Sequence, residues 1–379
     1  MKLLEWQGKY LLRQAGIPVA EGQVAESKDD IENLHLNGDK MVVKAQVPVG
    51  GRGKAGGIKL AAEPQQIRDY AVSMLHSILK GFPVESVLIE EALDISEEMY
   101  LSILLQSSGE YLMLFTASGG MEIEEVAEKT PEKITKYLFT PDMAIAEYVF
   151  TDVLRKSGLR GNQLKAVSEV AWKLYQATVR YDLILAEINP LAVLKNGNVT
   201  AADAKLEVDD NALFRQPVAK EWVKPPTDEL ERRAKGIGVT FVDLDGDFGI
   251  VASGAGLAMA TMDLIRDMNY EPGNFLETGG GITDKLIAGS VGLVCSKEKV
   301  KGLIVNLYGG VNSLTAAAKG VVDGVAALPR KIPVVVKAQG NQQEECWRIL
   351  EEAGIPVVKT HRTEDAVRLL VESLGGKAV

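Results

Sequence analysis

Three side chains near the middle of the 379-residue chain have the oxygen atoms needed to hold a metal ion. Glu187 and Asn189 lie two residues apart in the segment LILAEINPLAVLK, and in a strand this spacing puts both on the same face. A carboxylate and an amide directed at one place in an otherwise apolar strand cost free energy unless they bind something. With Asp203 nearby, these hard oxygen ligands, completed by phosphates and water, are typical of a Mg²⁺–nucleotide site. The alternative is a hydrogen-bonded polar patch beside a hairpin.

The side on which Asp203 lies depends on the turn that precedes it. The Asn-Gly pair at 196–197, between LILAEINPLAVLK and NVTAADAKLEV, is the strongest short-range signal for a hairpin. A strict two-residue turn would pair Asp203 with Pro190 and point it away from the other two oxygens. A three-residue loop or a bulge would bring it opposite Leu191, onto their face.

A basic, glycine-rich stretch near residue 50 has the composition of a phosphate-binding loop. It follows a predicted strand over residues 41–47 that carries a lysine near its end. Backbone N–H groups that approach closely, together with cations, suit phosphate oxygens. The residues concerned are Lys44, Gly50, Gly51, Arg52, Gly53, Lys54, Gly56 and Gly57. The order differs from a Walker A loop, in which the lysine follows the glycines, and a surface loop with solvated cations is the alternative.

Two glutamates, Glu90 and Glu98, bracket the acidic run EEALDISEE. Glutamates at a strand end can accept hydrogen bonds from an adenine amine or from ribose hydroxyls. Taken alone, this charge run favours a solvated surface instead.

Two glycine-rich turns in the last third of the chain predict anion sites at helix starts. In ETGGGITDKL, residues 277–286, three glycines open a helix that Thr283 is expected to cap. In YGGVNSLTAAAKG, residues 308–320, side-chain donors join the glycines. Two such helix starts in one domain indicate a shared anionic substrate, and ordinary helix caps are the alternative.

The elements that must position these residues divide the chain in two. A polar stretch over 215–238 contains three prolines and predicts a linker followed by one short helix. Before it, the patterns predict a mixed α and β part with sheet-like apolar segments and helices over 4–15, 64–80 and 159–179. After it, the strands FGIVAS, GLIVNLY and PVVVK each precede glycine and a helix. This alternation predicts a flavodoxin-like, doubly wound parallel sheet with ligands at the carboxyl ends of its strands.

Composition and charge exclude several classes of protein. The formal net charge of −10 argues against nucleic-acid binding as the main function, and there is no apolar run long enough to span a membrane. His35, His76 and His361 have no metal-ligand spacing. The amphipathic start lacks the apolar core of a secretory signal, and Cys295 and Cys346 cannot form a disulfide framework, so we expect a cytoplasmic protein with reduced thiols.

Taken in order, the motifs resemble those of the β subunit of NDP-forming succinate–CoA ligase, from residue 1 to the end. They are VVKAQVPVGGRGKAGG, GGMEIEEVAE, LAEINPL, DAKLEVDDNALFRQP, GAGLAMATMD, NFLETGGG and GNQQE. The resemblance implies an α/β chain with an N-terminal ATP-grasp nucleotide-binding domain over residues 1–230. It also implies a flavodoxin-like CoA-ligase domain over residues 231–379.

The resemblance further implies roles for individual residues. ATP or ADP would be bound by Lys44, Gly51, Arg52, Gly53, Glu90, Leu93 and Glu98, and Mg²⁺ by Asn189 and Asp203. Glu187 would support phosphoryl exchange between the nucleotide and a histidine of a separate α subunit, which also binds most of the CoA. A helix beginning at Gly279, Gly280 and Gly281 would point at that phosphohistidine. Activity would require an αβ or (αβ)₂ assembly.

The expected acid site departs from the family pattern. Ser253 stands where the family has the asparagine of VNGAG, and Lys337 stands where it has the arginine of PVVVR. The remaining substrate contacts would come from Gly310, Val311, Asn312, Ser313 and Thr315. A hydroxyl in place of an amide changes which substrate oxygens can be paired. We therefore predict an acid other than succinate, such as malate, citrate or sulfoacetate.

Two other functions compete with this interpretation. A stand-alone ATP-grasp ligase that joins a carboxylate to an amine would complete its site within one chain. A non-catalytic nucleotide sensor would have no need to keep Lys44, Glu187, Asn189 and Asp203 together.

Overall fold

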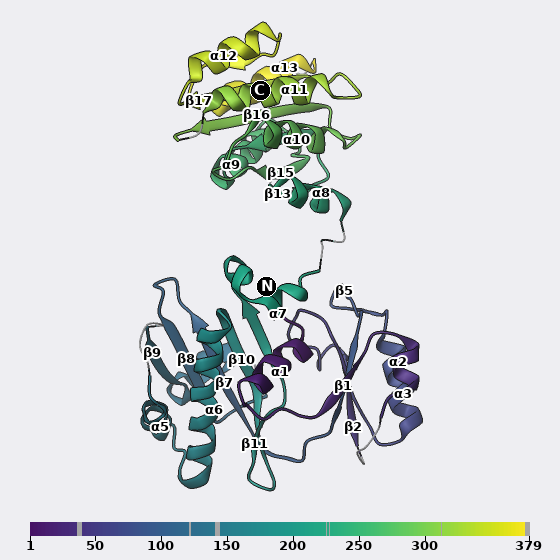
Figure 1. Cartoon of the computed structure of the whole chain (residues 1–379), viewed down its shortest axis with the longest axis vertical. Coiled ribbons are helices and arrows are strands. Elements are labelled where there is room, and N and C mark those ends of the chain that lie inside the picture. The colour runs from purple at the N-terminus through teal and green to yellow at the C-terminus, as the bar shows by residue number, and fades with distance from the viewer. Residues whose placement is uncertain are drawn as a thin grey trace. The chain divides into compact units, whose positions relative to one another are not determined.

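The computed structural model describes residues 1–35, 40–120, 123–140, 145–224, 226, 228–311 and 313–375. The chain forms two compact units, Met1–Val223 and Lys224–Val379 (Figure 1). The division falls within the polar, proline-containing stretch in which a linker was predicted.

Unit 1 begins with a four-stranded antiparallel sheet in the order β1-β6-β2-β3. Its strands are β1 (Gly22–Ala25), β2 (Met41–Ala45), β3 (Ile58–Ala61) and β6 (Val87–Glu91). The helices α2 (Lys28–Glu32) and α3 (Pro64–Met74) pack against it and bury Ile31 and Ile67 with Val43 and Ile89. This sheet carries Lys44 and Glu90.

The predicted helix over residues 64–80 is wrong in its second half. The helix α3 ends at Met74, and a small hairpin follows, made of β4 (Ile78–Leu79) and β5 (Phe82–Pro83). His76 and Lys80 have φ angles of 64° and 52°. Such left-handed residues interrupt a right-handed helix, and the apolar spacing alone did not reveal them.

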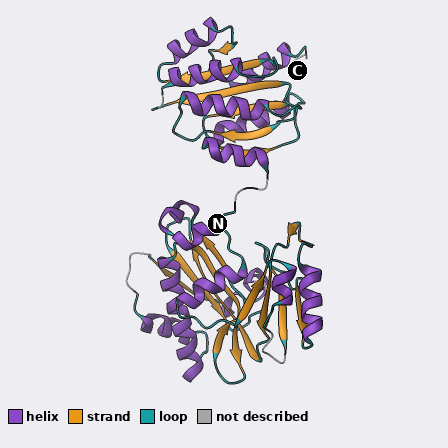
Figure 2. Cartoon of the chain, turned by 45° about the vertical axis from the view of Figure 1, so that its right-hand side comes forward, coloured by secondary structure: helices purple, strands orange, loops and turns teal. Residues whose placement is uncertain are grey.

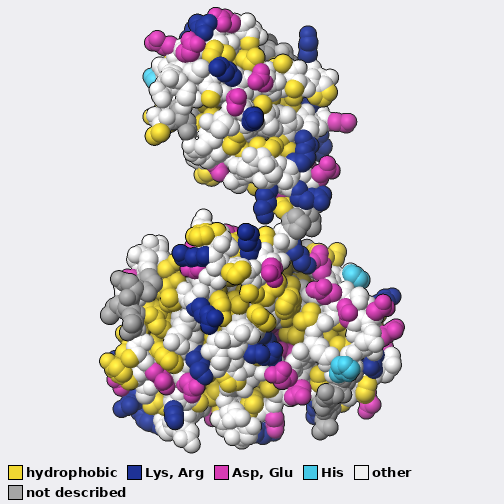
Figure 3. Space-filling view, in the orientation of Figure 1, with side chains coloured by type: hydrophobic (Ala, Val, Ile, Leu, Met, Phe, Trp, Pro, Cys, Tyr) yellow, Lys and Arg dark blue, Asp and Glu magenta, His cyan; other side chains and the backbone are white. Residues whose placement is uncertain are grey.

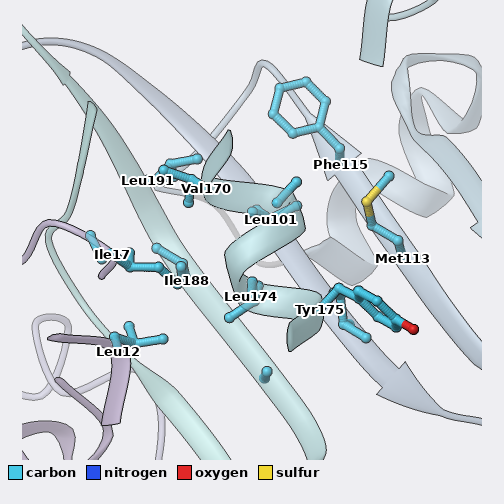
Figure 4. Close-up of a cluster of buried hydrophobic side chains, with 14 of the residues drawn as sticks. Leu12, Ile17, Leu101, Met113, Phe115, Val170, Leu174, Tyr175, Ile188 and Leu191 are labelled. Carbon is cyan, nitrogen blue, oxygen red and sulfur yellow. The ribbon is translucent and has the colours of Figure 1, made fainter. Parts of the chain in front are cut away.

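The second sheet of unit 1 is antiparallel, in the order β11-β10-β7-β8-β9, with β12 paired to β10. Its strands are β7 (Ile95–Leu105), β8 (Tyr111–Thr116), β9 (Thr135–Phe139), β10 (Leu183–Leu194), β11 (Val199–Ala201) and β12 (Lys205–Val208). The long helix α6 (Gly161–Arg180) packs on it. Figure 4 shows Val170 and Leu174 of α6 beside Leu101, Ile188 and Leu191 of the strands, in the largest buried core of the unit.

Shorter elements complete unit 1. They are α1 (Glu5–Gln14), α4 (Ile123–Lys129), α5 (Glu147–Arg155), α7 (Pro217–Glu221) and the 3₁₀ turns Pro131–Lys133 and Asp210–Arg215.

Unit 2 contains a six-stranded sheet in the order β13-β15-β14-β16-β17-β18. Its strands are β13 (Thr240–Asp243), β14 (Phe248–Ala252), β15 (Asn274–Glu277), β16 (Gly302–Gly309), β17 (Val334–Gly340) and β18 (Val357–Val358). All pairs are parallel except the edge pair β13–β15, which is antiparallel. The predicted doubly wound parallel sheet is therefore confirmed, whereas the short strands β13 and β15 were not predicted.

Helices cover both faces of this sheet, as Figure 2 shows. One face packs against α9 (Ala255–Asp267) and α13 (Thr363–Ser373). The other packs against α8 (Glu229–Ile237), α10 (Asp284–Cys295), α11 (Leu314–Ala326) and α12 (Gln343–Glu352). The strands are buried on both sides, which explains their nearly continuous apolar sequences.

The surface is mixed in charge. On the face drawn in Figure 3, Lys or Arg and Asp or Glu side chains are interspersed over both units. Among the described residues, no helix has the length and apolar character needed to cross a bilayer.

Candidate active site

The hairpin between β10 and β11 decides where Asp203 lies. It closes with a three-residue loop, 195–197, and pairs Leu191 with Ala201. The pair between β10 and β12 continues in the same register, which puts Asp203 across from Asn189. The three-residue alternative is thus confirmed, although the partner is Asn189 where Leu191 was expected.

Glu187, Asn189 and Asp203 consequently share one face of the sheet and line a cavity of about 510 Å³ in unit 1. The glycine-rich loop forms the opposite part of the wall through Gly51, Arg52 and Gly53. Sequence reasoning had assigned Gly51, Arg52 and Gly53 to the nucleotide, Asn189 and Asp203 to Mg²⁺, and Glu187 to phosphoryl exchange. The wall also contains residues that had not been singled out, among them Glu5, Gly120, Lys205 and Glu207.

Arg52 connects the loop to the hairpin. Its Nη2 donates to both carboxylate oxygens of Asp203, at 2.8 and 2.9 Å, and lies 2.7 Å from Oε2 of Glu5. Burial would lower the pKa of the guanidinium, but Glu5 and Asp203 raise it above its ordinary value. Arg52 is therefore a fixed positive charge in the cavity wall.

Lys44 stands directly behind this wall. Its Nζ lies 2.8 Å from Oε1 of Glu5, 2.7 Å from Oε2 of Glu90 and 2.8 Å from the carbonyl oxygen of Ala202. Burial would lower its pKa, but the two glutamates and Asp203 raise it. Lys44 and Glu90, predicted as separate nucleotide contacts, are thus ion-paired to each other.

Glu5 is the buried carboxylate that sequence reasoning missed. It is 2 % exposed, and Lys9 Nζ lies 2.9 Å from its Oε1, beside Lys44. Burial by itself would raise the pKa of Glu5, but Lys44, Lys9 and Arg52 together hold that pKa well below its usual range. Its signal was the spacing: Glu5, Lys9 and Leu12 lie on the same, buried side of the amphipathic helix α1.

Glu187 has a different environment from the paired carboxylates. Among the residues that the structure describes, it forms an ion pair with Lys205 alone, at 3.3 Å, across the β10–β12 pair. Burial raises the pKa of Glu187, and Lys205 offsets only part of that shift. The carboxyl group of Glu187 therefore holds a proton more readily than an ordinary glutamate does.

A pair of glycines brings Asn189 and Glu98 together. The N–H of Gly120 donates to Oδ1 of Asn189 at 3.0 Å. A Cβ at Gly120 would lie 2.0 Å from Oε2 of Glu98, and one at Gly119 would lie 2.4 Å from the backbone of Met99. Only glycine therefore permits this close approach. Neither the exposed Glu98 nor Leu93, which lies half-buried between β6 and β7, lines the cavity.

The donor chemistry of this wall fits Mg²⁺. Asn189 and Asp203 present amide and carboxylate oxygens to one cavity, and such hard ligands suit that ion. Among the described residues no group of three His, Cys, Asp or Glu side chains could hold a metal ion. Phosphate and water oxygens would have to complete the coordination, as is usual for Mg²⁺.

The expected acid site in unit 2 is held by backbone contacts. Oγ of Ser253, at the end of β14, accepts from the N–H of Tyr308 at 2.7 Å and lies 3.3 Å from its carbonyl oxygen. Gly254 follows with a φ of 116° and precedes helix α9. Ser253 thus ties the end of β14 to β16, and its substrate role stays a prediction.

The second glycine turn of unit 2 leads into α11. Ser313 and Thr315 both donate their hydroxyl hydrogens to Oε1 of Gln342, the latter at 3.0 Å. Gly310 is exposed and Val311 is 95 % exposed. The predicted substrate contact Asn312 lies outside the described residues.

The glycines of ETGGGITDKL precede their helix instead of beginning it. Thr283 caps α10 as predicted, accepting from the N–H of Leu286 at 3.2 Å. Gly279, Gly280 and Gly281 lie in the preceding turn, where the N–H of Gly279 donates to Oε2 of Glu277 at 2.8 Å.

Comparison with known proteins agrees with both halves of this description. The ATP-grasp domain family matches residues 2–193, and the CoA-ligase family matches residues 251–371. The ADP-forming succinate–CoA ligase β subunit of Ignicoccus hospitalis is 39 % identical over 97 % of this chain and 99 % of its own. The chain belongs to the family of succinate–CoA ligase β subunits.

Other members and structures are consistent with this assignment. The GDP-forming succinate–CoA ligase β subunit of Thermus thermophilus is 37 % identical, with both chains fully covered. The structure of ATP citrate lyase from Methanothrix soehngenii, in complex with citrate and coenzyme A, covers 98 % of this chain with a TM-score of 0.80 at 18 % identity. The latter likeness shows that the fold is shared. In this β-subunit family member, the ATP-grasp match includes Lys44, Arg52, Glu187 and Asn189, whereas Asp203 follows it.

Proposed function

We propose that this chain is the nucleotide-binding and acid-binding β subunit of an NDP-forming acid–CoA ligase, working with a separate α subunit. The observation that carries the proposal is the cavity of unit 1. The cavity is lined by Arg52, Glu187, Asn189 and Asp203, and Lys44 lies directly behind its wall.

The nucleotide site uses charge to bind phosphates. Arg52 and Lys44 neutralise the phosphate oxygens of ATP or ADP, and the loop at Gly51 and Gly53 lets the backbone approach them. Asn189 and Asp203 would hold Mg²⁺, which supplies neutralisation of charge on the phosphates. Glu90, Leu93 and Glu98 are proposed to serve the rest of the nucleotide, by resemblance to the family.

Glu187 is proposed to face the histidine of the α subunit that carries the phosphoryl group. A carboxylate that accepts from one imidazole N–H fixes the ring and leaves its other nitrogen for phosphoryl transfer. The half-buried position of Glu187, with Lys205 as its ion-pair partner, suits this role.

Unit 2 is proposed to supply the acid site and the contact with the phosphohistidine. The acid would lie near Ser253, Gly310, Val311, Asn312, Ser313 and Thr315, and Gly279–Gly281 would face the phosphohistidine. The α subunit would bind most of the CoA, in an αβ or (αβ)₂ complex. Because Ser253 replaces an asparagine of the family pattern, we propose malate, citrate or sulfoacetate as acids to set beside succinate.

The division of labour is tested by co-expressing the chain with the α subunit of its own organism and supplying ATP labelled on the γ-phosphate. Label is expected on a histidine of the α subunit, and it should be lost with Glu187→Gln. Glu169→Gln, which alters a half-buried glutamate paired to Lys173 on helix α6, is the matched control. Label on the β chain would contradict the proposal.

The acid is tested by steady-state kinetics of the same complex with succinate, malate, citrate and sulfoacetate. We expect one of the last three to have the highest kcat/KM. A clear preference for succinate would overturn the altered specificity and leave the ligase assignment in place.

A further inference from the structure

A buried carboxylate in unit 1 has no role in the proposed reaction. Glu5 begins helix α1 at the back of the cavity wall and is 2 % exposed. It takes neither the metal position, proposed for Asn189 and Asp203, nor the histidine-facing position, proposed for Glu187. A carboxylate removed from water is stable only when other groups compensate its charge.

The two oxygens of Glu5 are shared among three cations. Lys44 and Lys9 lie 2.8 and 2.9 Å from Oε1, and Arg52 lies 2.7 Å from Oε2. Without the carboxylate, these three positive groups would repel one another in a region with little water to screen them. Glu90 also pairs with Lys44 and Lys9, and Asp203 with Arg52, so Glu5 is the carboxylate that joins Lys44 to Arg52.

Arg52 also contacts two carboxylates, those of Asp203 and Glu5. Its Nη2 hydrogen bonds go to both oxygens of Asp203, and the 2.7 Å pair with Glu5 lacks hydrogen-bond geometry, so that Oε2 of Glu5 accepts no hydrogen bond. A buried acceptor that receives no hydrogen bond is costly. Because Nη2 of Arg52 already lies 2.7 Å from this oxygen, Arg52 has a second carboxylate partner at hand if it releases Asp203.

Asp203, the proposed metal ligand, is thus paired with Arg52, the proposed phosphate ligand, so Arg52 occupies the oxygens that the metal ion would need. A cation at Asp203 is repelled by a guanidinium on the same oxygens, so Arg52 must leave Asp203 when the site takes a metal–nucleotide complex. Glu5 offers Arg52 a second, permanent partner at the place where phosphates are expected.

We propose that Glu5 is a positioning residue of the nucleotide site: it retains Arg52 and Lys44 in the wall while Asp203 exchanges Arg52 for a metal ion. The inference rests on the proposed nucleotide site. Metal binding and phosphate binding are then coupled through the guanidinium of Arg52. When Arg52 pairs with Glu5, Asp203 is free for the metal ion and Arg52 is held where the phosphates are expected.

The test is calorimetric titration of the full chain with ADP, once with Mg²⁺ and once with a chelator. Glu5→Gln keeps the size of the side chain and removes its charge. We expect the affinity for Mg–ADP to fall about tenfold or more, and the gain in affinity that Mg²⁺ provides to shrink, because Arg52 stays on Asp203. Glu169→Gln, far along the chain on helix α6 and paired to Lys173, should bind like the wild type within about twofold.

A double-mutant cycle with Arg52→Met separates positioning from general stability. If Glu5 acts through Arg52, Glu5→Gln should cost much less affinity in the Arg52→Met chain than in the wild type. Equal losses in both backgrounds, accompanied by a lower unfolding temperature, would show a structural role and overturn the inference.

Two further outcomes are decisive. If Glu5→Gln does not fold, Glu5→Asp is measured instead. This variant keeps the charge but is one methylene too short to contact both Lys44 and Arg52, so we expect weaker binding of Mg–ADP. Binding equal to that of the wild type would overturn the inference.

The role of Glu5 and the proposed nucleotide site fail in different ways. A wild-type chain that does not bind Mg–ADP would overturn the proposed nucleotide site itself. Normal binding by the wild type and by Glu5→Gln would overturn only the role of Glu5.

Discussion

The proposed ligand-binding region of unit 1 is built from ion-paired side chains, whereas that of unit 2 is built from uncharged polar groups. In unit 1, Glu5, Lys44, Arg52, Glu90 and Asp203 form a continuous set of ion pairs around the cavity. In unit 2, the carboxyl ends of the strands carry glycines, hydroxyls and an amide that bond to one another or to backbone groups. They include Ser253 with Tyr308, and Ser313 and Thr315 with Gln342.

The two regions differ in whether their buried basic side chains are paired with carboxylates. The cations of unit 1 are stabilised by carboxylates, so they are available to a polyanion as fixed charges. The lysine of unit 2 that replaces a family arginine, Lys337, is 6 % exposed, and burial lowers its pKa. Its Nζ lies 3.4 Å from Oδ1 of Asn306 within the sheet. The acid proposed for unit 2 would therefore depend on backbone N–H groups, helix starts and hydroxyls.

The comparison is tested most strongly at Glu187. Glu187→Gln should reduce the rate of phosphoryl exchange in the αβ complex by about 100-fold or more, because an amide cannot take the charge of the carboxylate. Binding of Mg–ADP should change little, since Glu187 is not proposed to hold nucleotide. Rapid-quench measurement of histidine phosphorylation, with calorimetry of ADP binding, checks both. A large loss of ADP affinity would place Glu187 in the nucleotide site instead.

Asp203→Asn separates the proposed metal-binding role of Asp203 from its ion pair with Arg52. The affinity for Mg–ADP should fall about tenfold to 30-fold, because a metal ligand loses its charge. The affinity for ADP without Mg²⁺ should stay the same or increase, since Arg52 is freed from its 2.8 Å contact. Titrations with and without chelator distinguish these effects, and equal losses in both would contradict the exchange of partners at Arg52.

Ser253→Ala probes the uncharged region. The half-buried Ser253 hydroxyl accepts from the N–H of Tyr308, and its removal should cost about 1–2 kcal/mol, or roughly tenfold in kcat/KM for the acid. Mg–ADP binding to unit 1 should be unchanged. Steady-state kinetics of the αβ complex and calorimetry measure the two. Ser253→Asn should shift the preference among acids toward succinate, and an unaltered preference would remove Ser253 from the specificity site.

The smallest effect is expected at the thiols of unit 2. Burial raises the pKa of Cys295 and of Cys346 to about 12. The thiolate is the reactive form, so neither should react with Ellman's reagent at pH 8 in the folded chain, and both should react in denaturant. Rapid reaction of the native protein would show that unit 2 opens more readily than its packing indicates.

The local features of the site could be predicted because they depend on short-range geometry. The two-residue spacing of Glu187 and Asn189 is sufficient to put them on one face of a strand. The family motifs likewise indicated Arg52 and Asp203 before their 2.8 Å contact was known. The helix over 64–80 was wrong because a left-handed residue such as His76 leaves no mark in apolar spacing.

The sequence by itself determined the alternation of strands and helices in unit 2 and the membership in the β-subunit family, and it indicated Arg52, Glu187, Asn189 and Asp203 among the cavity residues. Only the tertiary structure decided that Asp203 faces Asn189, that Lys44 is paired with Glu90, and that Glu5 lies among the cations. The physical reason is distance along the chain. Helix α1, the loop near residue 50 and the hairpin after residue 190 meet only once both sheets of unit 1 have packed, and the free energy of a charge depends on which groups surround it there.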